Sequence, residues 1–401
     1  MARPELLFLT QRIPYPPIKG EKIRPLQILR HLSRRYTVHL GCFIDDDADW
    51  AHVPRVRELC GECHFVKLRP RVAKVACLRG LAGSEPLSKF YFRDGGLAAW
   101  VRGLLARRRP EAAFVCSSAM AQYLLDVPHF PARTVMDFAD VDADKWRQYA
   151  ETRAGPMRWV YARESRTLLA YDRRVGAAFA ASTFVSAAEA AIFRRLAPEL
   201  AARTHHVNSG VDAAYFSPEH GFATPYGDDP AVVFTGTMSY WPNVDAVTWF
   251  AEAILPAVRR SQPRVQFYIV GSSPSAEVRQ LGKQPGIVVT GRVPDVRPYV
   301  AHAAASVAPL RIANGVQNKV IEAMAMAKPV IATPRALAGV EADRENEVVV
   351  AESAEDFAAA TLAVLAGGAL AGRGERARAR VLAAYDWDRN LRGFDSLLEP
   401  V

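Results

Sequence analysis

The chain has 401 residues, of which 50% are hydrophobic, so it can bury two cores of ordinary size and two domains are expected. Its net charge of +9 belongs to one half: residues 1–200 hold 32 Lys and Arg against 21 Asp and Glu, whereas residues 201–401 hold 19 against 21. No apolar run is long enough to span a bilayer, and the first residues show no signal-peptide cleavage pattern, so we expect a cytoplasmic protein.

Apolar runs of strand length recur along both halves. They are ELLFLT, TVHLGCF, AAFVCS and RTVMDF in the first half, and AVVFTG, VQFYIV, GIVVTG, ASVAPL and PVIAT in the second. Each is followed by a helical or loop stretch, which is typical of parallel sheets with helices on both faces. The pattern predicts an α/β fold with two Rossmann-like, doubly wound parallel-sheet domains.

The loop after the first strand is rich in turn residues. Pro14, Pro16 and Pro17 follow ELLFLT, and the segment from Gly20 to Arg24 leads into a helix. On this spacing alone, Gly20 is a turn residue at a helix entry and Arg24 is a surface residue.

Five cysteines, an odd number, fit a reducing compartment. Cys60 and Cys63 form a Cys-x-x-Cys pair, which invites a zinc or redox interpretation. No second such pair completes a four-ligand site, so we expect no metal.

Residues 65–109 carry eleven Lys and Arg against only Glu85 and Asp94, with leucines and aromatic residues interleaved. A solvated basic face, a nucleic-acid surface and a membrane-docking surface are three alternatives. No helix-turn-helix, RNP or zinc-finger pattern accompanies the charge, so we expect no nucleic-acid partner. We favour docking on an anionic membrane, because each basic residue gains about 1 kcal/mol near acidic headgroups and aromatic residues enter the interface.

Acidic residues follow the strand RTVMDF, namely Asp137, Asp140, Asp142 and Asp144. Because ligands of open α/β sheets bind beyond the carboxyl ends of the strands, at least one carboxylate is expected to face a ligand. We interpret this cluster as acceptor-binding.

The first domain is expected to end between Leu200 and Ser217. The segment SAAEAAIFRRLAPELAA (186–202) has helical spacing, and residues 205–230 have the Gly, Pro, Asn and Asp density of loops. We therefore assign residues 1–205 to an N-terminal domain and residues 206–375 to a C-terminal domain.

Residues 306–333, SVAPLRIANGVQNKVIEAMAMAKPVIAT, have the pattern of strand, loop, helix and strand. Gly315 is expected to open the helix, with Lys319 and Glu322 together on a face separate from the apolar residues. An isolated pair at this spacing is usually a solvated surface pair. Here it lies at the carboxyl end of an apolar strand, where a helix start and a lysine favour an anion, so the pattern predicts a phosphate-bearing ligand.

Several segments together resemble a known family. They are QRIPYPPIKGEKIR (11–24), VMDFADVDADKWRQYA (135–150), VNSGVD (207–212), FTGTMSYWPNVDAVTWF (234–250), GRVPDVRPY (291–299), the segment 306–333 and YDW (385–387). The chain resembles retaining glycosyltransferases of the GT-B fold, family 4 type, and more narrowly the sugar transferases of PEP-CTERM/exosortase exopolysaccharide systems. The resemblance implies two domains facing a cleft, the first holding the acceptor and the second the nucleotide sugar, with residues 376–401 crossing back onto the N-terminal domain.

The resemblance also implies residue roles. Glu322 matches the glutamate that accepts hydrogen bonds from the ribose hydroxyls, and Lys319 matches the basic residue that holds the diphosphate. Gly315 and Val316 would present N–H groups to the same phosphates. The remaining residues assigned to the donor site are Gln317, Gly236, Thr237, Arg292, Val293, Arg311 and Gly20, the last facing the diphosphate from the N-terminal domain. Asp137, Asp140 and Arg24 are assigned to the acceptor.

Two positions depart from the family pattern. Asn314 stands where relatives often have a second glutamate against the donor sugar; an amide still donates and accepts, so sugar contact is retained. The turn Gly236-Thr237-Met238 lacks the arginine and lysine found in many relatives, and Arg311 or Arg292 is expected to compensate.

The function implied is a retaining transferase of the hexosyltransferase type, moving sugar from a UDP- or GDP-sugar to a lipid-linked or oligosaccharide acceptor in exopolysaccharide or cell-surface glycan synthesis. No obligatory cofactor is implied, and the enzyme would lie on the inner face of the membrane. Another GT-B enzyme, such as a nucleotide-sugar epimerase or a phosphorylase, and a non-catalytic membrane scaffold are the alternatives.

Overall fold

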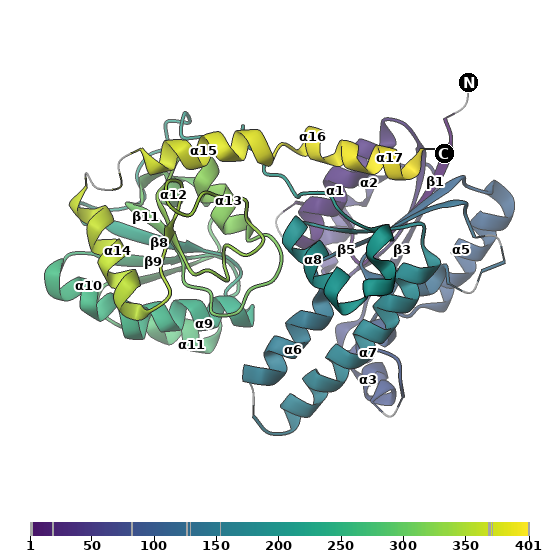
Figure 1. Cartoon of the computed structure of the whole chain (residues 1–401), viewed down its shortest axis with the longest axis horizontal. Coiled ribbons are helices and arrows are strands. Elements are labelled where there is room, and N and C mark those ends of the chain that lie inside the picture. The colour runs from purple at the N-terminus through teal and green to yellow at the C-terminus, as the bar shows by residue number, and fades with distance from the viewer. Residues whose placement is uncertain are drawn as a thin grey trace. The chain divides into compact units, whose positions relative to one another are not determined.

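The computed structural model describes residues 3–17, 20–81, 83–125, 127–128, 130–152, 154–367, 370 and 372–399, without the side chain of Arg79. The chain forms two compact units (Figure 1). The first unit contains the chain up to Ser209 together with the segment from Asp388 onward, and the second runs from Gly210 to Trp387.

In the described part of the first unit, seven parallel strands lie in the order β3-β2-β1-β4-β5-β6-β7. The strands are β1 Glu5–Thr10, β2 Thr37–Ile44, β3 Cys63–Lys67, β4 Ala112–Cys116, β5 Arg133–Ala139, β6 Ala181–Phe184 and β7 Thr204–His206. The helices before residue 209 are α1 Gly20–Ser33, η1 Asp47–His52, α2 Val53–Arg57, α3 Pro70–Gly80, α4 Leu87–Tyr91, α5 Gly95–Arg108, η2 Ser118–Tyr123, α6 Asp142–Thr152, α7 Pro156–Ala178, α8 Ala187–Leu196 and η3 Pro198–Arg203.

The second unit holds six parallel strands among its described residues, in the order β10-β9-β8-β11-β12-β13. They are β8 Ala231–Thr235, β9 Gln266–Val270, β10 Ile287–Gly291, β11 Ala305–Ala308, β12 Val330–Ala332 and β13 Val349–Val350. The helices are α9 Trp241–Trp249, η4 Phe250–Ile254, α10 Leu255–Ser261, α11 Ala276–Leu281, α12 Arg297–His302, α13 Asn318–Ala325, α14 Ala354–Ala366 and α15 Arg373–Ala384.

The predicted fold class, two doubly wound parallel-sheet domains, is confirmed. Every apolar run predicted as a strand forms one, because helices cover both faces of these sheets and apolar side chains suit positions that are buried on both sides. In β4 and β8, for example, all the residues are buried.

Both sheets have a point where the strand order reverses, between β1 and β4 in the first unit and between β8 and β11 in the second. The loops that leave the carboxyl ends of two such strands run in opposite directions, which opens a crevice at that edge of the sheet. Each unit therefore offers a ligand position at this edge.

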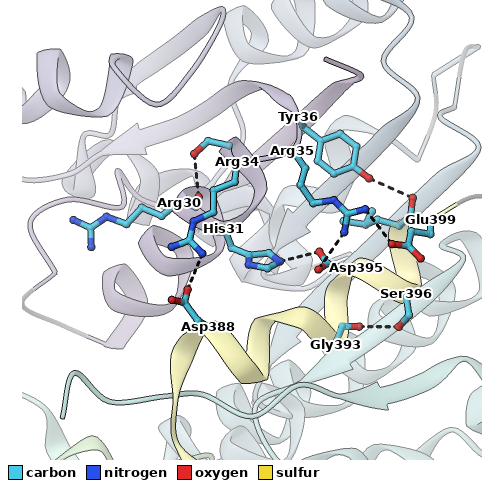
Figure 2. Close-up of polar contacts among 12 residues, drawn as sticks. Arg30, His31, Arg34, Arg35, Tyr36, Asp388, Gly393, Asp395, Ser396 and Glu399 are labelled. Carbon is cyan, nitrogen blue, oxygen red and sulfur yellow. Dashed lines mark hydrogen bonds and ion pairs between the residues drawn. The ribbon is translucent and has the colours of Figure 1, made fainter. Parts of the chain in front are cut away.

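Residues 388–399 pack within the first unit, through most of α16 (Trp387–Leu391), η5 (Arg392–Phe394) and α17 (Asp395–Leu398). Phe394 is fully buried against Phe114, with ring centroids 4.9 Å apart. Side chains of the same segment also pair with the end of α1 and the residues just after it (Figure 2); the pairs are Arg34–Asp388, His31–Asp395, Arg35–Asp395 and Arg35–Glu399.

A hairpin of α6 and α7 extends from the body of the first unit (Figure 1). Arg163 in α7 is buried and donates to the carbonyl oxygens of Gly80 and Gly83, which lie at the end of α3 and just beyond it. Glu164, the next residue, accepts from the backbone N–H of Leu87 at 2.8 Å, at the start of α4. The hairpin thereby fixes the position of α3.

Candidate functional site

The start of α13 lies at the reversal point of the second sheet, after β11. Gly315 lies in the preceding loop, so the prediction that it opens the helix is wrong by three residues. Its φ of +64° is a left-handed conformation that favours glycine. Gly339 packs on it so closely that a Cβ there would lie 2.3 Å from the Gly315 oxygen.

The N-cap residue of α13, Gln317, makes no side-chain capping bond; its amide donates to the Asn314 carbonyl at 2.8 Å instead. The first N–H groups of an α-helix have no acceptor within the helix. Here their direction, along the helix axis toward the crevice, suits an anion.

Lys319 lies in the first turn of α13 and is half-buried. Its Nζ donates to Asn243 Oδ1 at 3.0 Å and lies 5.0 Å from the centre of the Phe234 ring. Burial lowers the pKa of Lys319 to about 8, with a smaller opposing effect from Glu322. The ammonium is thus poorly compensated, and an anionic ligand would relieve that cost.

Glu322 lies one turn further along the same helix and is also half-buried. Burial raises the pKa of this carboxyl to about 7, opposed by Lys319. Burial raises the pKa of Tyr215, and the charges of Asp295 and Glu322 act in the same direction. The exposed Tyr215 ring lies 3.6 Å from the Arg297 guanidinium.

The other predicted donor residues lie on loops of the same unit. Gly236 and Thr237 follow β8, and Arg292 and Val293 follow β10, with Arg292 exposed and Val293 half-buried. Arg311 follows β11, and two of its guanidinium nitrogens are paired with α9: Nε and one Nη donate to Asp245 at 3.0 and 2.5 Å. Arg311 therefore braces α9 in this structure.

In the first unit, Gly20 begins α1, and Arg24 and Asp137 form a buried pair. Two nitrogens of Arg24 donate to the two carboxylate oxygens of Asp137, each at 2.9 Å, and the Thr183 hydroxyl donates to Asp137 at 2.8 Å. These groups connect α1, β5 and β6. Their hydrogen-bonding capacity is largely used inside the protein.

Asp140 lies beyond the end of β5 and is half-buried. Burial raises the pKa of its carboxyl to about 7, and the nearby carboxylates Glu189 and Asp142 act in the same direction. Of the three residues assigned to the acceptor, Asp140 is the one whose side chain best suits contact with a ligand.

Sequence reasoning missed Asn243, which lies in the first turn of α9 and is 5% exposed. A polar residue in the apolar segment WPNVDAV was the available signal. Within the described residues, no group of three or more His, Cys, Asp or Glu is placed to hold a metal ion. None of the described helices is both long and apolar enough to cross a membrane.

Residues 229–367 match the family model described as glycosyl transferases group 1. No curated protein sequence matches the chain. Similar solved structures include sucrose-phosphate synthase from Thermosynechococcus elongatus, with 16% identity, a TM-score of 0.73 and 98% of each chain covered. HepE from Anabaena in complex with UDP and glucose has 13% identity, a TM-score of 0.67 and both chains fully covered. Trehalose 6-phosphate synthase from Burkholderia multivorans has 12% identity and a TM-score of 0.66, with 99% of this chain and 98% of that chain covered.

At such identities the structural likeness establishes the fold, which is GT-B. The family match lies within the second unit and includes Lys319 and Glu322. Together, the family match and the fold support a glycosyltransferase of the group 1 type.

Proposed function

We propose that the protein is a retaining, family 4 type glycosyltransferase that moves a hexosyl group from a nucleotide sugar to a saccharide acceptor. The observation that carries the proposal is the pairing of Lys319 with the open start of α13 at the reversal point of the second sheet. A poorly compensated ammonium beside the N–H groups that begin a helix suits a diphosphate.

The donor would lie along α13. Its phosphates would contact Lys319 and the N–H groups that begin the helix, and its ribose hydroxyls would donate to Glu322. The Asn314 side chain would contact the sugar. We favour UDP as the nucleotide of the donor, since the similar HepE structure is a complex with UDP and glucose.

Breaking the anomeric C–O bond transfers negative charge to the departing diphosphate. Lys319 and the helix start would stabilise that charge, which is how pre-positioned donors lower a barrier. Retention follows when the acceptor hydroxyl attacks on the face that the diphosphate leaves, with the diphosphate taking its proton. No enzyme nucleophile is required.

The first unit would bind the acceptor, with Asp140 hydrogen-bonded to one of its hydroxyls. Arg24 and Asp137 would act indirectly, by holding β5 in place. We propose a lipid-linked acceptor in exopolysaccharide or cell-surface glycan synthesis, met at the cytoplasmic face of the membrane.

Helix α3 is the part of residues 65–109 best suited to a membrane surface. Its outer face exposes Val72, Val75 and Leu78, which are 60 to 64% exposed, beside Arg71 and Lys74. No acidic residue lies in the helix. The aromatic residues of the stretch contribute less, because Phe92 is buried and Trp100 stacks on His64.

Transfer and hydrolysis assays with UDP-, GDP- and TDP-sugars test the activity. We expect release of one nucleoside diphosphate in wild type, and a loss of about 10² to 10³ in rate for Lys319→Ala, the effect of removing one oxyanion donor. Lys283→Ala, an exposed lysine of the same unit, is the matched control. Full activity in Lys319→Ala would overturn the assigned role. Epimerised sugar, or no reaction with any donor, would favour the alternative functions.

Flotation with liposomes tests the membrane surface. We expect the protein to bind vesicles that contain about one third acidic lipid. The variant in which Val72, Val75 and Leu78 are changed to serine should no longer bind them. The control changes Val350 and Leu382, exposed apolar residues of the second unit, to serine. Equal binding to neutral and acidic vesicles would refute the docking surface.

A further inference from the structure

Asn243 connects the loop after β8 to the first turn of α13. Its Nδ2 donates to the Thr237 carbonyl at 3.0 Å, and its Oδ1 accepts from Lys319 Nζ at 3.0 Å. A carbonyl oxygen only accepts and an ammonium only donates, so this pair of neighbours fixes the orientation of the amide.

The surroundings leave little freedom for this contact. A Cβ at Gly236 would lie 2.7 Å from Asn243 Nδ2 and 3.5 Å from Lys319 Cε, so the loop passes close to both side chains. On the other side of Gly236, a Cβ at Gly271 would lie 1.7 Å from its oxygen. The loop is therefore held between β9 and the Asn243 amide.

A fully buried lysine of the first unit shows the contrast. Lys22, in the first unit, is 4% exposed, and its Nζ lies 2.5 Å from Asp49 Oδ2. That lysine is neutralised by its partner. Lys319 instead has a neutral amide at hydrogen-bond distance, and no carboxylate of the described residues lies within 4.0 Å of its Nζ. An amide orients an ammonium without cancelling its charge.

We propose that Asn243 is a positioning residue that directs the Lys319 ammonium toward the diphosphate of the donor while leaving its charge available. This inference rests on the proposed function, and it assigns to α9 a part in donor binding. A carboxylate at the same place would satisfy the lysine and repel the phosphates.

The titration of Lys319 reports this contact, because few other groups bear on it. Glu322 faces it from its own helix. Phe234 of β8 and Asn243 of α9 carry no titrating proton, and Asp245, further along α9, is paired with Arg311. Removing the amide acceptor disfavours the charged lysine, and adding a carboxylate favours it.

The test compares Asn243→Ala and Asn243→Asp in the full-length protein. Pulsed acetylation with acetic anhydride between pH 6 and 10, read by peptide mass spectrometry, gives the apparent pKa of Lys319. We expect it to fall in Asn243→Ala and to rise in Asn243→Asp. Calorimetry with UDP should show about tenfold weaker binding in both, because one loses the lysine orientation and the other repels phosphate. Thr248→Ala on the same helix is the control.

An unchanged Lys319 titration in both variants, or unchanged UDP binding in both, would overturn the inference. If Asn243→Ala does not fold, Asn243→Ser replaces it. An apparent pKa of Lys319 equal to that of wild type in Asn243→Ser would then count against the inference in the same way. The two proposals fail separately. Wild-type protein that binds and turns over no nucleotide sugar refutes the function, whereas active wild type with insensitive Asn243 variants refutes the positioning role alone.

Discussion

The pKa values of Glu322 and Lys319 predict a bell-shaped pH dependence for donor turnover. Productive binding requires an ionised Glu322 to accept ribose hydroxyls and a charged Lys319 to hold phosphate. Burial raises the first pKa to about 7 and lowers the second to about 8. The ionised fraction of Glu322 then falls from about three quarters at pH 7.5 to about one tenth at pH 6, and the charged fraction of Lys319 falls similarly at pH 9.

We therefore expect kcat/KM, which follows the product of the two fractions, to fall about sixfold at pH 6 and about sixfold at pH 9, relative to pH 7.5. The assay is nucleoside diphosphate release at low donor concentration across this range. In Glu322→Gln the acidic limb should disappear, since the amide does not titrate. The basic limb should persist and move to lower pH, because the charge of Glu322 raises the pKa of Lys319. Glu355→Gln, an exposed carboxyl of the same unit, is the control. A flat wild-type profile, or an acidic limb that survives in Glu322→Gln, would refute the reasoning.

Three further predictions concern packing. Arg24→Met leaves Asp137 charged and buried, so we expect a loss of about 3 to 5 kcal/mol in unfolding free energy by urea denaturation; a loss below about 1 kcal/mol would contradict the buried pair. Gly339→Val displaces the loop at Gly315, and calorimetry should show at least about tenfold weaker UDP binding, with Gly227→Val, which has open space around it, as control. Phe394→Ala should lower the unfolding free energy by about 3 to 5 kcal/mol, and a stability equal to wild type would show that the buried ring is dispensable.

The sequence predicts strands well where burial is complete on both faces and poorly where it is not. The four strands that were missed are β3, β6, β7 and β13. In β3 most residues are half-buried at the edge of the sheet, and β13 has only two residues. β6 is fully buried but polar, because Thr183 donates to Asp137 across the sheet. None of these gives a continuous apolar run.

For the site, local spacing places Lys319 and Glu322 together, because one helix turn determines their proximity. The apolar residues that the pattern places on another face of that helix include Val320, Ile321 and Met324, which are buried. The partnership of Lys319 with Asn243 was not predictable, since 76 residues separate the two and only the strand order brings β8 beside β11. The pairing of Arg24 with Asp137 depends on tertiary packing in the same way.

The packing of residues 388–399 within the first unit has a consequence for the order in which the nascent chain folds. A ribosome makes the chain up to Ser209 long before it reaches Phe394 and Leu398, both of which are fully buried in that unit. Until then the nascent unit leaves uncovered the apolar surface around Phe114 that Phe394 covers in the folded unit. Its completion must therefore wait until the intervening 178 residues from Gly210 to Trp387 have been translated, and chaperones that shield apolar surface would have that interval in which to act.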